Sequence, residues 1–97
     1  MTKRDEYVRK LKNQLDQWNA EAAKWEQKTK SAQSEMRAEY EKYLGSFRSR
    51  RDEAVYQLRQ LQAATGEAWM DMMQGADAAW RAVGEAFVKA RSHFEKK

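Results

Sequence analysis

Residues 8–36 read VRKLKNQLDQWNAEAAKWEQKTKSAQSEM, and this stretch decides the fold class of the chain. Apolar or small side chains recur in it at alternating spacings of three and four, and charged or amide side chains lie between them. A seven-residue repeat of this kind forms one stripe along an α-helix and indicates packing against other helices. The stripe consists of Val8, Leu11, Leu15, Trp18, Ala22, Trp25, Thr29, Ala32 and Met36.

The same stripe continues beyond residue 36 after a shift in phase, which locally unwinds a supercoil. Its later members are Tyr40, Phe47, Ala54, Leu58 and Leu61. The chain contains no proline, the residue that most effectively ends a helix. We therefore predict one uninterrupted helix over residues 3–63, roughly 90 Å long. The size of Trp18 and Trp25 favours a bundle of three or four helices over a tight two-stranded coil.

Residues 64–66, Ala-Thr-Gly, are the predicted turn or bend, because a threonine hydroxyl caps helices and glycine permits tight turns. A straight continuation of the helix is the alternative. Residues 67–94 then form a second, amphipathic helix at 100° per residue. Its apolar face consists of Trp69, Met73, Ala76, Trp80, Val83, Phe87 and Phe94.

Three interpretations of this second face remain open: packing back on the first helix as an antiparallel hairpin, an oligomer seam, or insertion into a lipid surface. We predict an all-α fold with residues 1–97 in a single domain and the second helix folded back. A folded-back helix would cover only the distal half of the first, so residues 3–30 would keep a bare apolar stripe. We therefore expect a coiled-coil or helical-bundle homo-oligomer, most simply an antiparallel dimer.

Composition argues against catalysis and against nucleic-acid binding. The chain has no cysteine and one histidine, His93, so it cannot assemble a thiolate or histidine metal site, and its four glycines are isolated. We predict no catalytic residue, no metal and no cofactor. The net charge of +4 is small, and acidic neighbours follow the densest basic run, residues 48–51, so nucleic acid is not an expected partner.

The first twelve residues contain no apolar run, and no window of about 18 apolar residues exists, so we expect a soluble protein. The absence of cysteine is typical of a reducing compartment. Together these features predict a cytoplasmic location.

Several segments resemble a family of small bacterial coiled-coil proteins that are often labelled stress-response or uncharacterised. The segments are MTKRDEY at 1–7, LDQWNAE at 15–21, RDEA at 51–54 and GEAW at 66–69, followed by Gly75 and the pair Ala79-Trp80. The resemblance covers nearly the whole chain. It implies a long helix followed by an amphipathic helix and a role without catalysis, and it carries over no binding residue. The chain departs from the family pattern at Trp25, Tyr43 and Met70.

The leading functional hypothesis from the sequence is a non-enzymatic, self-associating structural or adaptor protein, with a protein partner on the aromatic stripe of residues 67–94. The alternative hypothesis is a peripheral membrane-surface protein that binds lipid through the same residues.

Overall fold

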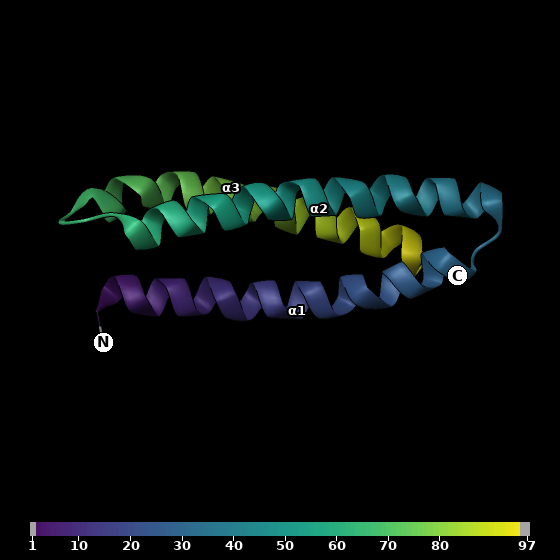
Figure 1. The fold of residues 1–97 in the computed structure, drawn as a ribbon, viewed down its shortest axis with the longest axis horizontal. Helices are drawn as coiled ribbons and strands as arrows, with labels where there is room; N and C mark the ends of the chain where they lie inside the picture. Colours follow the sequence, from purple (N-terminus) through teal and green to yellow (C-terminus); the bar gives the residue numbers. More distant parts are fainter. Residues whose placement is uncertain (1, 96–97) are drawn as a thin grey trace.

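A computed structural model describes residues 2–95 as three α-helices and shows no strand among these residues. The helices are α1 (Lys3–Ser31), α2 (Ser34–Ala63) and α3 (Ala68–Phe94). They lie side by side in an up-down-up bundle, so that α1 and α3 run parallel and α2 runs against both (Figure 1). The all-α prediction is confirmed. The principal extents are 52 × 19 × 18 Å.

The predicted single helix over residues 3–63 is wrong, because the chain leaves the helical conformation at Ala32 and Gln33, both of which are extended. Two hydroxyls weaken the helix just before this point. The Thr29 hydroxyl donates to the Trp25 carbonyl at 2.8 Å, and the Ser31 hydroxyl donates to the Gln27 carbonyl at 3.1 Å. Such back-bonding slightly destabilises and bends helices.

The break is then stabilised by contacts that exist only in the folded-back chain. The Arg37 guanidinium, one turn into α2, donates to the Ala32 carbonyl at 3.1 Å and so satisfies part of the open end of α1. The larger gain is apolar burial, which contributes roughly 1.5–3 kcal/mol for each large side chain. A straight helix would leave the α1 stripe in water, and the bend covers it within the same chain.

The second connection agrees with the predicted turn at residues 64–66. Gly66 adopts a φ of 62°, in the left-handed region that favours glycine. The Arg4 side chain of α1 donates to the Ala64 carbonyl at 2.7 Å and ties the amino end of the chain to this turn. α3 packs antiparallel on α2, as the hairpin interpretation expects. The arrangement differs from the prediction in that α1 joins them as a third helix.

The core runs the length of the bundle and is built from one face of each helix. Trp25 contributes several of its aromatic contacts: its ring stacks on Phe94 with centroids 5.2 Å apart and meets Phe47 edge-on at 6.4 Å. The buried apolar residues are Val8, Leu11, Trp18, Ala22 and Trp25 from α1, Leu44, Phe47, Ala54, Leu58 and Leu61 from α2, and Ala76, Trp80, Val83, Ala90 and Phe94 from α3.

This core covers the α1 stripe that the long-rod prediction leaves bare. α2 and α3 of the same chain provide the covering surface, so the argument from an exposed seam over residues 3–30 to an oligomer does not hold.

The ends of the helices are held by specific polar contacts. Thr2 caps α1, since its hydroxyl accepts a hydrogen bond from the Asp5 amide at 3.1 Å. At the other end of α1, Lys28 donates to the Phe94 carbonyl at 2.7 Å, which places a cation at the carboxyl end of α3. Within residues 2–95, none of the three helices is long and apolar enough to cross a membrane.

Candidate functional site: the groove between α1 and α3

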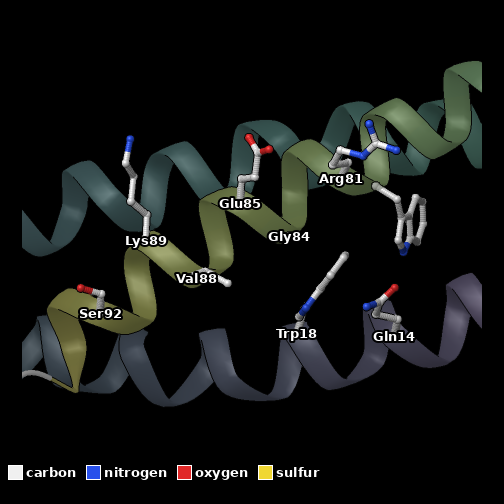
Figure 2. Close-up of a pocket in the computed structure, with 9 residues that line it drawn as sticks. Gln14, Trp18, Arg81, Gly84, Glu85, Val88, Lys89 and Ser92 are labelled. Atoms are coloured by element: carbon white, nitrogen blue, oxygen red, sulfur yellow. The ribbon is translucent and has the colours of Figure 1, made fainter.

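A largely apolar groove of about 780 Å³ runs between α1 and α3. Its size lies within the roughly 300–1,000 Å³ typical of ligand pockets. Figure 2 shows Trp18 rising from α1 toward α3, with Val88 at the edge of the space between the two helices. The lining residues are Gln14, Trp18, Trp80, Arg81, Gly84, Glu85, Val88, Lys89 and Ser92.

The groove exists because large indoles hold α1 away from α3 while a glycine leaves the α3 side empty. The Trp18 ring lies between α1 and α3, with its centroid 6.2 Å from that of Trp80 and 6.0 Å from that of Phe87. Gly84 lies between Trp80 and Phe87 on α3. A Cβ added at this position would lie 3.7 Å from the Trp18 ring, which is an ordinary contact distance. The glycine is therefore not needed for packing inside this chain, and its effect is to keep the groove open.

Val88 is the clearest sign that this surface is unpartnered within the chain. Its exposed fraction is 65%, the highest among the large hydrophobic side chains that are exposed. By contrast, Trp18 and Trp80 below it are only 8% and 5% exposed. A rigid aromatic floor with an exposed aliphatic side chain at its rim is the pattern of a surface that binds another apolar group.

The floor also holds a polar group without a partner. The Trp80 indole N–H is buried, and no acceptor lies within hydrogen-bond distance of it among the described residues. A buried donor left unpaired costs about 1–3 kcal/mol. Because Trp80 lines the groove, this cost falls at the site itself.

The outer rim of the groove is charged. Arg81, Glu85 and Lys89 are exposed and extend from α3 away from α1 (Figure 2). None of the three forms an ion pair with another described residue, although they stand four residues apart along the helix. Their charges are therefore accessible to a partner.

A further polar contact joins α1 to α3 nearer the amino end of α1. The Tyr7 hydroxyl donates to the Asp77 carboxylate of α3. The pKa of Tyr7 is raised above its ordinary value by burial, by this hydrogen bond and by the carboxylate charge. The phenol therefore remains protonated and continues to donate as the pH rises above neutral.

The described residues contain no cluster of metal-ligating side chains. Residues 2–95 contain no group of three or more side chains that could hold a metal ion. The single histidine, His93, stacks on Tyr43 with ring centroids 3.8 Å apart, and its Nδ1 lies 3.6 Å from a Glu39 carboxylate oxygen. This places the ring as a packing element at the junction of α2 and α3.

Most of the predicted interface residues lie inside the bundle. Those of the first stripe that are buried are Val8, Leu11, Trp18, Ala22, Trp25, Thr29, Phe47, Ala54, Leu58 and Leu61, and those of the second face are Ala76, Trp80, Val83 and Phe94. Leu15, Tyr40, Trp69, Met73 and Phe87 are partly buried against this core. Met36 is 46% exposed, because it follows the break and no longer continues the α1 stripe.

Sequence reasoning missed the two residues that define the groove, Gly84 and Val88. Val88 lies beside the predicted apolar face of residues 67–94, about 100° around the helix from Trp69, so it was not assigned to that face. An isolated glycine one turn before it is a weak signal by itself. Gly84 and Val88 together predict a groove only when the position of α1 beside them is known.

Comparison with known proteins identifies no relative for this chain. No family model matches it, and no curated protein and no solved structure match it. The functional assignment therefore depends on the geometry of the groove.

Proposed function

We propose that this protein is a non-enzymatic, self-associating adaptor that assembles through the groove between α1 and α3. The observation that carries the proposal is the exposed Val88 at the rim of a floor made of buried indoles and a glycine. An amphipathic helix that lays its apolar side into a hydrophobic groove is a recurrent mode of protein recognition. We further propose a cytoplasmic location, which the cysteine-free composition supports, and a stress-related role, which the sequence resemblance supports.

A helical partner fits this groove better than an embedded small molecule does. The hollow is open along one side of a rod 52 Å long and is not an enclosed pocket. Its charged rim residues, four apart on α3, suit the charged flanks of a second helix. These features favour an extended, helix-shaped occupant.

The membrane alternative requires a larger rearrangement. Trp80, Val83 and Phe94, the residues that would insert into lipid, are 5%, 0% and 2% exposed. Lipid contact through this face would require α3 to leave the bundle and lose its packing on α2. Binding to vesicles is therefore expected only under conditions that open the bundle.

Molar mass measured by light scattering across a range of protein concentrations tests the proposal. The wild-type chain should rise from 11.5 kDa toward twice that mass, whereas Val88→Lys should remain at 11.5 kDa. Tyr56→Lys is the matched control, since Tyr56 is 56% exposed on α2 and lies outside the groove. Circular dichroism at 222 nm should be the same for all three proteins.

Two results would contradict the proposal. One is a wild-type chain that stays monomeric at about 1 mM, the upper limit for a meaningful affinity. The other is a Val88→Lys variant that assembles as well as the wild type does.

A further inference from the structure

α3 carries a row of four charges that alternate in sign. Arg81, Glu85 and Lys89 extend away from α1, and Asp77 lies where Tyr7 of α1 reaches it. Asp77, Arg81, Glu85 and Lys89 stand four residues apart, and all four are exposed. Residues at this spacing form one continuous ridge on the helix surface. The Arg81, Glu85 and Lys89 charges have no ion-pair partner within residues 2–95, and Asp77 accepts a hydrogen bond from Tyr7.

This row is complementary to its own reverse. Its signs are negative, positive, negative, positive, so a second copy that runs in the opposite direction presents the opposite sign at every position. With the two-fold axis at the level of Val83, Asp77 faces Lys89 of the second copy and Arg81 faces Glu85 of the second copy. A parallel copy in the same register would place each charge opposite its like.

The neighbouring ridge of α3 supports the same arrangement. Trp80, Gly84 and Val88 are also four residues apart and line the groove. This ridge has its own centre at Gly84, one residue from Val83, so the axis at Val83 brings Val88 within two residues of Trp80 of the second copy and leaves the two Gly84 positions two residues out of register. Glycine lets two helix backbones approach closely, and the exposed valine then covers the aromatic floor.

We infer that the occupant of the groove is α3 of a second copy of this chain, antiparallel and centred on Val83, with a crossing angle of about −50°. This angle is the one at which ridges of residues four apart align between two helices. The inference rests on the proposed self-association and adds its partner, direction and register. In this dimer both the charged ridge and the apolar ridge find complementary neighbours.

Charge-swap variants test the register directly. Arg81→Glu places Glu opposite Glu85 at two symmetry-related contacts, and Glu85→Arg places Arg opposite Arg81. Each single variant should raise the dimer dissociation constant on the order of 10-fold at low salt. The double variant with both substitutions restores opposite charges and should return the constant to within about 3-fold of wild type.

Mixing the two single variants provides the sharpest test. A chain with Arg81→Glu carries two acids at the contact, and a chain with Glu85→Arg carries two bases, so the heterodimer regains both attractive contacts. Sedimentation equilibrium should show more dimer in the mixture than in either variant alone. Raising the salt concentration to about 0.5 M should reduce these differences, because the Debye length shortens to only a few ångströms.

Arg59→Glu is the control for net charge, since Arg59 is exposed on α2 and lies away from the groove. It should leave the dissociation constant within about 2-fold of wild type.

The outcomes separate this inference from the proposal on which it rests. If wild type dimerises and Val88→Lys does not, but the charge-swap variants and their mixture match wild type, the antiparallel register is wrong while self-association through the groove stands. If wild type remains a monomer, both fail. If Arg59→Glu weakens the dimer as much as Arg81→Glu, the effect is one of net charge and the inference is overturned.

Discussion

Removing the Trp25 indole should strongly destabilise the bundle. Trp25 is 3% exposed, and its ring lies 5.0 Å from that of Phe87, 5.2 Å from that of Phe94 and 6.4 Å from that of Phe47. Truncation of a buried tryptophan to alanine costs about 3–5 kcal/mol. The three ring contacts, each worth roughly 0.5–1.5 kcal/mol, place Trp25→Ala toward the upper end of that range.

A loss of this size is large for a chain of 97 residues, whose total stability is about 5–15 kcal/mol. The free energy of unfolding, measured by urea titration with circular dichroism at 222 nm, should fall by about 4 kcal/mol, and Tm should fall on the order of 20 °C. Tyr56→Ala is the matched control: its ring is 56% exposed on α2, so the change should stay within about 0.5 kcal/mol.

In the Val88→Lys background, which the proposed assembly leaves monomeric, the loss caused by Trp25→Ala should not depend on protein concentration, because the indole packs within its own chain. A core shared between copies would instead make stability rise with concentration. A cost below about 1 kcal/mol, or a cost that varies with concentration, would refute the assignment of Trp25 to an intramolecular core.

Four further predictions concern the helix ends, the glycines and the contact between α1 and α3. Thr2→Ala should lower the free energy of unfolding by about 1 kcal/mol in urea titrations, because the Asp5 amide loses its cap, and an unchanged value would contradict this role. Gly45→Ala should raise it by about 0.5–1 kcal/mol, since the helical position is open to solvent with nothing within 4 Å of an added Cβ. Gly66→Ala should instead lower it by about 1 kcal/mol, because the φ of 62° is strained for any residue with a Cβ, and a gain at this position would show that the turn differs. Because the pKa of Tyr7 is raised in the folded protein, the stability that its phenol contributes is complete below the ordinary pKa of 10.0 and is lost as the pH rises above that value. Tyr7→Phe should therefore flatten the fall in Tm between roughly pH 9.5 and 11.5. An unchanged slope would contradict the contact with Asp77.

The sequence predicts the residues of the core much better than the path of the chain. The seven-residue repeat from Val8 to Thr29 depends only on local spacing, and the residues that it selects in α1 are buried or half-buried. The turn at residues 64–66 has its own local signal in Gly66, which adopts a left-handed conformation. Both features are encoded within a few residues of the place where they act.

The break at Ala32 and Gln33 has no comparable local signal. The apolar period continues through Thr29, Ala32 and Met36 as though the helix went on, and the chain contains no proline. What favours the break is tertiary: the indoles of α1 are covered by Phe47, Phe87 and Phe94 only when the chain folds back. The free energy gained by this packing depends on contacts between residues far apart in the sequence. The spacing of apolar residues along one helix does not show such contacts.

The groove could not be predicted for the same reason. Its existence depends on Trp18, whose ring lies between α1 and α3, and on the absence of a side chain at Gly84 beside that ring. The alternating charges from Asp77 to Lys89 are visible in the sequence, but four-residue spacing also suits ion pairs along one helix. Only the structure shows that these rim charges stand beside an open apolar surface.

The distance between α1 and α2 tests the folded-back bundle most directly. Spin labels at Lys10→Cys and Gln60→Cys can be attached without interference, because the chain has no other cysteine and both positions are exposed. Dilution with unlabelled protein removes distances between copies. A continuous helix would separate the two positions by roughly 75 Å, since each residue adds 1.5 Å. The bundle has cross-sectional extents of 19 and 18 Å and therefore predicts a label separation of roughly 20–35 Å in nearly all molecules. A dominant distance near 75 Å would contradict the bundle and remove the groove with it.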